Sequence, residues 1–226
     1  MNYEVYDMNP PLTPHTFVDI HNNPMKNATK ASILHTCIEL FAHSGYSAVS
    51  IREITRNVGI KESSLYNHFR NKNEIIETIY TNYRMELARI LPSMEKVDEL
   101  IPLMEPEVFM QQGFTLFKMS YNNPTFEKMW RIVQIEQFRD VRARDIYLND
   151  ICNNTLLFVE QVFQKLINMG KMKPLDPTDL AAAYQYPVFA MMIEYYILKC
   201  DQKDTSLLEK RMNNHIQQFF QNNLTS

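Results

Sequence analysis

Apolar residues recur at helical spacing through most of this chain, and that periodicity limits the folds that the chain can adopt. The stretch between residues 28 and 44 is typical, with a one-sided apolar stripe made of Ile33, Leu34, Cys37, Ile38 and Phe41. Only four glycines occur in 226 residues, which disfavours a β-fold built on many tight turns. The sequence therefore predicts an all-α protein.

Capping and breaking residues divide this pattern into separate helices. Ser50 and Glu53 form the S-x-x-E pattern that begins a helix, and Asn71 begins another that Pro92 stops. Gly59 ends the second helix, since glycine adopts positive φ at little cost. The predicted helices cover residues 28–44, 51–58, 61–69, 72–91, 94–101, 106–122, 125–139, 142–169, 177–199 and 204–222.

The two short helices on either side of Gly59 form a helix-turn-helix. The second would be roughly 13 Å long at about 1.5 Å per residue, and the major groove of B-DNA, about 12 Å wide, admits such a helix. Leu65 and Phe69 would face the core. The other side of this helix carries groups that can hydrogen-bond to bases or phosphates, those of Ser63, Ser64, Tyr66, Asn67 and His68.

The charge distribution supports an anionic partner for this region alone. The whole chain has a net charge of −3, but residues 25–72 hold seven Lys or Arg and three Glu, a net of +4. Residues 73–226 hold sixteen basic and twenty acidic residues, a net of −4. Lys72 begins the fourth predicted helix, where unpaired N–H groups and the helix dipole already favour an anion. This asymmetry predicts one small region that meets an anion.

The order of these residues resembles the tetracycline-repressor (TetR) family of bacterial transcription regulators. The resemblance covers about residues 28–78 without a gap. It rests on Ile33…Phe41…Gly45-Tyr46, Ser50-Ile51-Arg52-Glu53-Ile54, Val58-Gly59-Ile60 and Ser64-Leu65-Tyr66-x-His68-Phe69-x-x-Lys72. It implies that double-stranded DNA is contacted by Ser50, Arg52, Ser63, Ser64, Tyr66, Asn67, His68 and Lys72. It also implies a C-terminal helical domain that binds a small effector and forms the dimer.

Two positions depart from the family pattern. Thr55 stands where the family usually has Ala, at the crossing of two helices, and should loosen their packing slightly. Lys61 stands where Ser or Thr usually caps the recognition helix, and the loss of such a cap costs about 1 kcal/mol. We expect Lys61 to add a phosphate contact in return.

Other functions find less support in the sequence. His68 has no His, Cys or acidic residue three or four positions away, and His35 with Glu39 more readily forms an ion pair than a metal site. No nucleophile–base pattern and no glycine-rich phosphate loop is apparent, so neither an enzyme nor a bound cofactor is expected. The alternative function is a helical ligand-binding or scaffold protein whose helix-turn-helix contacts protein instead of DNA.

Aromatic residues and methionines are abundant between residues 100 and 200. Most of them should form the core of a large helical domain, and a subset is expected to line a cavity for an apolar or aromatic effector. The candidate lining residues are Phe114, Phe117, Tyr121, Trp130, Phe163, Tyr184 and Met191. Pro187 is expected to kink its helix and open space beside Tyr184 and Met191.

The last two predicted helices are expected to form a homodimer interface. The helix over residues 177–199 gathers on one side Leu180, Ala183, Tyr184, Val188, Met191 and Tyr195. The helix over residues 204–222 gathers on one side Leu208, Met212, His215, Ile216, Phe219 and Phe220. A terminal helix with so much apolar surface needs cover, which the intrachain core could also supply.

These observations divide the chain into three parts. Residues 1–24 are expected to be a flexible arm without a core face, dispensable for DNA binding. Residues 25–72 form the helix-turn-helix DNA-binding domain, and residues 73–226 the helical regulatory and dimerisation domain. Three scattered cysteines indicate buried, reduced thiols, and no apolar run approaches the 18 or so residues that span a membrane, so a cytoplasmic location is expected. The predicted function is a transcriptional repressor released from a palindromic operator by a small-molecule effector.

Overall fold

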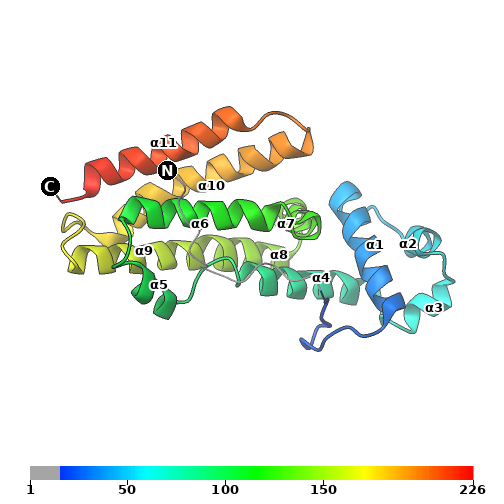
Figure 1. Ribbon diagram of the computed structural model, residues 1–226. Coiled ribbons are helices and arrows are strands. Elements are labelled where there is room, and N and C mark those ends of the chain that lie inside the picture. The colour runs from blue at the N-terminus through cyan, green and yellow to red at the C-terminus, as the bar shows by residue number, and fades with distance from the viewer. Residues whose placement is uncertain (1–15, 226) are drawn as a thin grey trace. The chain divides into compact units, whose positions relative to one another are not determined.

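Helices make up nearly all of the regular structure in the computed structural model, which describes residues 16–225 apart from the side chains of Phe117 and Tyr121 (Figure 1). Within these residues the only β-pairing is two isolated bridges, Val18 with Pro24 and Met172 with Leu224. The expectation of an all-α protein is therefore confirmed.

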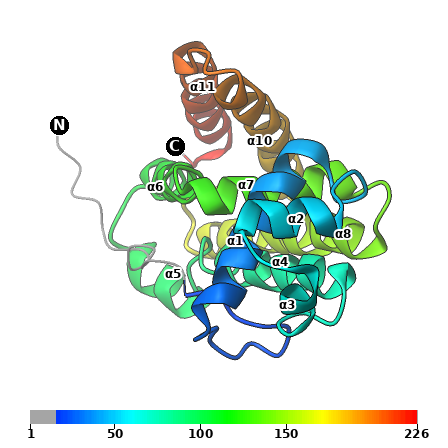
Figure 2. The same cartoon turned by 90° about the vertical axis from the view of Figure 1, so that its right-hand side faces the viewer.

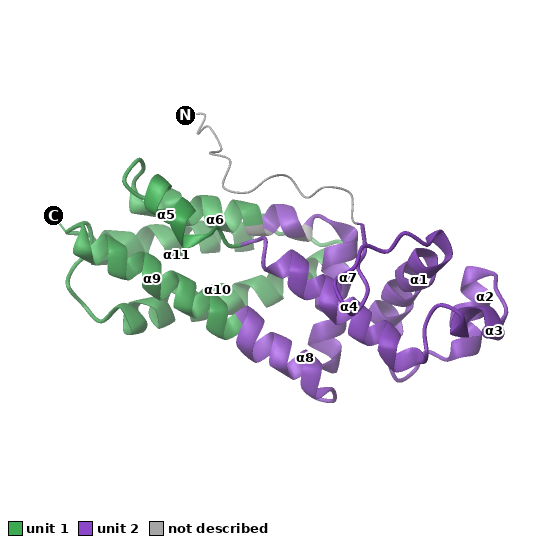
Figure 3. Ribbon diagram, turned by 90° about the horizontal axis from the view of Figure 1, so that it is seen from below, with its two compact units in different colours: residues 1–8, 91–116, 152–226 green, residues 9–90, 117–151 purple. Residues whose placement is uncertain are grey.

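The chain divides into two compact units, which Figure 3 shows in separate colours. Among the described residues, unit 1 comprises 91–116 and 152–225, and unit 2 comprises 16–90 and 117–151. The predicted division at residue 72 is one of function and stays a prediction. By packing, the fourth helix and residues 117–151 belong with the first three helices.

Unit 2 is built around the first helix, which packs against the second, fourth and seventh. The apolar stripe predicted for residues 28–44 is buried throughout. The helices of this unit are α1 (Ala28–Ser44), α2 (Ile51–Val58), α3 (Glu62–Tyr66), α4 (Lys72–Leu87), α7 (Pro124–Glu136) and α8 (Val141–Asp145).

The predicted helix starts and stops coincide with local hydrogen bonds. The Ser50 hydroxyl accepts the N–H of Glu53 at the start of α2, and the Asn71 side chain accepts the N–H of Glu74 at the start of α4. Gly59 follows α2 in the left-handed conformation, with φ 79°. These caps confirm the boundaries that the sequence predicts for α2 and the start of α4.

Unit 1 has its own core, centred on the ring of Phe163. That ring lies 5.6 Å from the ring of Tyr184, 5.4 Å from that of Phe219 and 6.1 Å from that of Phe220. The elements of this unit are α5 (Met94–Leu100), the first part of α6 (Pro106–Tyr121), α9 (Asn154–Asn168), α10 (Pro177–Cys200) and α11 (Ser206–Asn223).

Most of the residues that we expected at a dimer interface belong to this core. The buried ones are Leu180, Tyr184, Val188, Tyr195, Leu208, Met212, Ile216, Phe219 and Phe220. The prediction that these residues meet a second subunit is therefore wrong. The physical reason is that α10 is apolar on more than one side, so its sequence pattern does not say which side faces the core.

The single helix predicted for residues 142–169 is interrupted by a π-helix, η1 (Ile146–Asn153), between α8 and α9. Arg84 of α4 binds Asp145 at 2.5 Å and Asp150 at 2.6 Å. Residues five apart lie on different sides of an α-helix, but the wider π-helix brings them toward one side. The π-helix thus allows one guanidinium to bind both carboxylates.

Residues 16–24 are not a free arm. Phe17 and Val18 are only 7% and 5% exposed. The buried side chain of Asn82 on α4 accepts the N–H of Val18 at 2.9 Å and donates to its carbonyl at 2.8 Å. The expectation of an arm without a core face is therefore wrong for these residues, and residues 1–15 lie outside the described part of the chain.

The three cysteines differ in exposure. Cys37 is buried, Cys152 is half-buried and Cys200 is exposed. The expectation of buried thiols thus holds for Cys37 alone. Burial raises the pKa of the Cys37 thiol to about 12, although the charge of Lys72 opposes the shift, so this thiol stays neutral.

Candidate DNA-binding site

A tight turn at Gly59 joins α2 to α3. The N–H groups of Gly59 and Ile60 both donate to the Thr55 carbonyl, at 2.9 and 3.0 Å. Thr55 is buried, and its hydroxyl donates to the Arg52 carbonyl at 3.2 Å. The extra hydroxyl of this residue is therefore satisfied within its own helix.

The α-helical part of α3 is shorter than the predicted span of residues 61–69, and a hydrogen-bonded turn continues it. The N–H groups of His68 and Phe69 donate to the Leu65 carbonyl at 2.9 and 3.0 Å. The side chains of Leu65 and Phe69 are buried, as expected. The segment is thus fixed against the core of unit 2 at its middle and at its C-terminal end.

The five predicted α3 side chains lie together on the solvent side of this segment. Ser63, Tyr66 and Asn67 are exposed, and Ser64 and His68 are half-buried. Figure 2 shows α2 and α3 side by side in unit 2. The structure therefore gathers two hydroxyls, a phenol, an amide and an imidazole on one small surface.

Three further predicted residues surround the start of α2 and of α3. Ser50 caps α2, and Arg52 is exposed with its Nε 3.3 Å from Oε1 of Glu62 on α3. Lys61 is exposed at the N-cap position of α3 and forms no side-chain capping bond there. The missing cap that the sequence predicts is thus confirmed.

Lys72 is held more closely than its position in the motif suggests. Its ammonium donates to the Tyr46 carbonyl and lies 4.1 Å from the centre of the Tyr46 ring and 5.5 Å from that of Phe41. Burial lowers the pKa of Lys72, and the nearby carboxylate of Glu136 opposes the shift. Lys72 is therefore also a structural residue of the turn after α1.

The same turn is bound from α7. Glu136 is 2% exposed, and its carboxylate accepts the N–H of Tyr46 at 2.8 Å. A Cβ on Gly45, whose φ is 80°, would lie 3.3 Å from the same Glu136 oxygen. Tyr46 is thus fixed through both of its backbone polar groups, by Glu136 on one side and Lys72 on the other.

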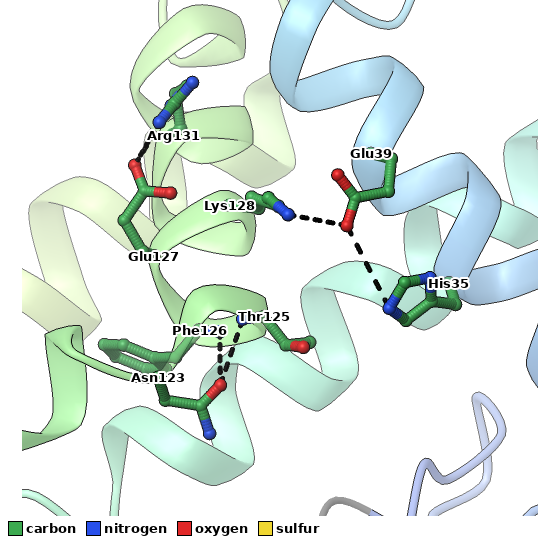
Figure 4. A network of polar contacts seen from close by, with 8 residues as sticks. All are labelled: His35, Glu39, Asn123, Thr125, Phe126, Glu127, Lys128 and Arg131. Carbon is green, nitrogen blue, oxygen red and sulfur yellow. Dashed lines mark hydrogen bonds and ion pairs between the residues drawn. The ribbon is translucent and has the colours of Figure 1, made fainter. Parts of the chain in front are cut away.

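A second polar contact ties α1 to α7, as Figure 4 shows. Lys128 of α7 binds Glu39 of α1 at 2.6 Å, and His35 lies 3.9 Å from the same Glu39 oxygen. His35 and Glu39 thus pair with each other as the sequence predicts. Within residues 16–225, no group of three or more His, Cys, Asp or Glu is placed to hold a metal ion.

A groove of about 250 Å³ borders the end of α3. Besides predicted residues it includes Lys30 of α1 and Arg70, which the sequence pattern does not single out. The full lining is Asp19, Ile20, His21, Lys30, Tyr66, Asn67, His68, Phe69, Arg70 and Glu74. Arg70 stands in the unspecified gap of the motif before Lys72, where only its positive charge could have drawn attention to it.

Comparison with known families settles what this helix-turn-helix belongs to. Residues 33–79 match the family described as "Bacterial regulatory proteins, tetR family", a span that contains α2, α3 and the turn between them. The helix-turn-helix region of this chain belongs to the TetR family. Members of this family are transcriptional regulators, and this TetR-family chain is a DNA-binding regulator.

Two relatives of this TetR-family regulator are also described as transcriptional regulators. The probable HTH-type transcriptional regulator YttP of Bacillus subtilis is 21% identical over 147 residues, which cover 65% of this chain and 67% of the relative. The biofilm operon negative regulator IcaR of Staphylococcus epidermidis is 41% identical over 46 residues, 20% of this chain and 25% of the relative.

A solved TetR-like structure shows the same fold along most of the chain. This is the complex of SmeT with triclosan, with a TM-score of 0.58 and 15% identity over 88% of this chain and 93% of that one. SmeT is described as the repressor of the multidrug efflux pump SmeDEF of Stenotrophomonas maltophilia. None of the helices in the described part of our TetR-family chain is long and apolar enough to cross a membrane.

The predicted effector-binding residues of this TetR-family regulator fall in both units. Phe163 and Tyr184 are in the core of unit 1, and Phe114 and Met191 are partly buried against that core. Trp130 is buried on α7 in unit 2. The side chains of Phe117 and Tyr121 lie outside the described part of the structure, so the lining of the effector cavity stays a prediction.

Proposed function

We propose that this regulator is a homodimeric repressor that binds a two-fold symmetric operator and leaves it when a small apolar molecule binds. The observation that carries the proposal is the solvent side of α3, where groups suited to bases and phosphates lie opposite buried Leu65 and Phe69. IcaR is described as a negative regulator, and SmeT is a repressor solved with triclosan. Both support the proposed mode of action.

In this proposal the α3 groups divide into base readers and phosphate contacts. Asn67 is exposed near the end of α3, and an amide can bond to an adenine edge. Tyr66, His68 and Lys72 donate to phosphates. The ion pair of Arg52 with Glu62 is exposed and therefore worth at most about 1 kcal/mol, so a phosphate can displace Glu62.

Ser50 and Lys61 complete the proposed contact from the starts of the two helices. The Ser50 hydroxyl accepts a backbone N–H, which leaves its own proton to donate to a phosphate. Lys61 can reach a phosphate because no capping bond holds its side chain. Ser63 and Ser64 are short enough to approach either a base edge or the backbone. We also propose that the protein is located in the cytoplasm, where it can meet the chromosome.

The dimer face that we propose is the exposed side of α10. Apolar residues three and four positions apart form a continuous solvent-facing stripe there, made of Ala183, Tyr186, Ala190, Ile193 and Ile197. Such a stripe on a terminal helix is typical of an interface between copies of a chain. The proposal thus keeps α10 at the predicted dimer interface, through a stripe that shares only Ala183 with the residues predicted for it.

We expect Ile197→Asp to convert the dimer to a monomer. Ile197 is 58% exposed in the single chain, and a carboxylate buried there without a partner in the dimer would weaken association by roughly a hundredfold or more. Sedimentation velocity across a range of concentrations measures the change. Leu157→Asp is the matched control, since Leu157 is an exposed apolar residue of α9 outside the stripe. A dimer that survives Ile197→Asp unchanged would rule out this face.

The effector site that we propose lies in unit 1, next to Tyr184. Pro187 cannot donate an N–H to the Ala183 carbonyl, and His215 of α11 reaches the adjacent Tyr184 carbonyl at 2.8 Å. Phe114 and Met191 pack on this core without being fully buried. Side chains that are only partly packed can move aside for an apolar ligand at a smaller cost than fully buried ones.

We expect apolar and aromatic compounds to change the fluorescence of Trp130 saturably and to release operator DNA over the same concentration range. A ligand can act on DNA binding only through its different affinities for the two conformations, so the two effects should share one midpoint. Phe114→Ala should raise this midpoint, whereas Leu157→Ala should leave it unchanged. Release by small polar anions alone would contradict the apolar site.

A further inference from the structure

We infer that the turn at residues 19–23 and the end of α3 form one site for a phosphate of the DNA backbone, beyond the helix-turn-helix itself. Lys30 and Arg70 supply its positive charge. The inference rests on the proposed function, because it requires that the solvent side of α3 faces DNA. It also reverses the expectation that residues 1–24 are dispensable.

The turn is fixed in place by specific hydrogen bonds. Val18 is paired with the buried Asn82 side chain, and the N–H of Met25 donates to the Phe17 carbonyl at 2.7 Å. The carboxylate of Asp19 accepts the N–H groups of both His21 and Asn23 at 2.9 Å. A turn anchored at its base and closed by its own side chain has a defined shape before any ligand arrives.

The turn lies beside α3, as Figure 2 shows for the segment that precedes α1. The groove between them holds about 250 Å³, room for a phosphate and several water molecules at about 30 Å³ each. Asp19 and His21 of the turn line this groove together with Tyr66 and Asn67 at the end of α3. A strand of DNA that contacts α3 can therefore extend into this groove.

The positively charged hydrogen-bond donors of the groove belong to Lys30 and Arg70. The two carboxylates keep their charge, but their oxygens already accept hydrogen bonds. Glu74 accepts the N–H of Arg70 at 2.8 Å and its Nε at 3.0 Å, and Asp19 accepts N–H groups of the turn. Arg70 is 75% exposed and has further N–H groups on its guanidinium, while the Lys30 ammonium lies 5.0 Å from the centre of the Phe69 ring. These donors suit an anion that approaches from solvent.

A backbone phosphate is the occupant to which the observations point, because the groove is continuous with the α3 surface. His21 and His68, which also line the groove, add ring N–H donors that suit a phosphate oxygen. Interactions of this kind position a protein on DNA without reading its sequence. The groove should thus increase affinity for all operators equally and should not change base preference.

The first test is the salt dependence of binding, measured by fluorescence anisotropy with operator DNA and the full chain. Lys30→Gln with Arg70→Gln should lower the slope of log affinity against log salt by about 0.9 for each phosphate that a subunit no longer neutralises. The control Lys96→Gln with Lys203→Gln removes two basic residues of unit 1 and should leave the slope unchanged. Thermal melting verifies that each variant is folded.

Methylphosphonate substitution along the operator locates the phosphate. One neutral linkage in each half-site should weaken binding of the unmodified chain and have little further effect on the Lys30→Gln, Arg70→Gln variant. Equal effects on both proteins, or an unchanged salt slope, would overturn the inference. Competition by inorganic phosphate with no change of slope would indicate a site for a free anion and would overturn it as well.

Asp19→Ala tests the turn separately. Loss of a negative charge beside DNA should by itself strengthen binding, whereas loss of the two hydrogen bonds that shape the turn should weaken it by roughly fivefold. A weaker complex supports the inference, and a stronger one contradicts the role of the turn. If the unmodified chain showed no salt-dependent binding to DNA, the proposed function itself would be wrong. If the unmodified chain did bind and these variants bound equally well, this inference alone would fail.

Discussion

Replacement of Lys72 by Ala should weaken operator binding at every sequence by about tenfold or more. The ammonium of Lys72 has three N–H donors, of which the Tyr46 carbonyl takes one, and the others can reach a phosphate. A phosphate contact carries no base preference, so the loss should be uniform across sequences. The salt slope should fall by about 0.9 in each subunit.

A second variant separates this contact from the structural role of Lys72. Lys72→Met keeps an apolar stem against the rings of Tyr46 and Phe41 but has no charge. It should lose as much salt dependence as Lys72→Ala while it melts at a higher temperature than that variant. If Lys72→Ala left the slope unchanged, Lys72 would serve only to hold the turn at Tyr46.

The second large effect is expected from Phe163→Ala. Phe163 is fully buried and contacts the rings of Tyr184, Phe219 and Phe220, so its truncation should lower the free energy of unfolding by about 3–5 kcal/mol. Urea denaturation followed by circular dichroism measures the loss. Leu157→Ala on the same helix should change the free energy of unfolding by less than about 0.5 kcal/mol, because Leu157 is exposed.

The size of this loss also bears on the effector site. A loss of about 3–5 kcal/mol in the free energy of unfolding indicates that the side chains around Phe163 are closely packed. The proposed ligand must then displace side chains. A change below about 1 kcal/mol would contradict the packed core, because truncation beside an existing cavity creates little new empty volume. In that case a saturating ligand that fills the cavity should raise the free energy of unfolding of the variant.

Local chemistry explains why so many helices could be predicted from the sequence. The Ser50 and Asn71 side chains bond to groups three residues away, and Gly59 needs only its own left-handed φ. The predicted α3 surface follows from the positions of Leu65 and Phe69 within one turn of helix. Capping residues and turn glycines act on residues close to them in the sequence, so the local sequence predicts their effects.

Partners distant in the chain account for what could not be predicted. Val18 meets Asn82 across 64 positions, and Tyr46 meets Glu136 across 90. Arg84 likewise meets its carboxylate partners at the π-helix across more than 60 positions. The sequence around one residue of such a pair does not predict the other residue. The sequence pattern therefore predicts an arm at residues 16–24 and gives no sign that Lys72 binds Tyr46.

The most direct test of the account is hydroxyl-radical footprinting of the full chain on an operator selected from genomic fragments. The account predicts two protected half-sites related by two-fold symmetry, in successive major grooves about 34 Å apart, with Asn67→Ala relaxing base preference within each half. Protection of a single asymmetric half-site would contradict it.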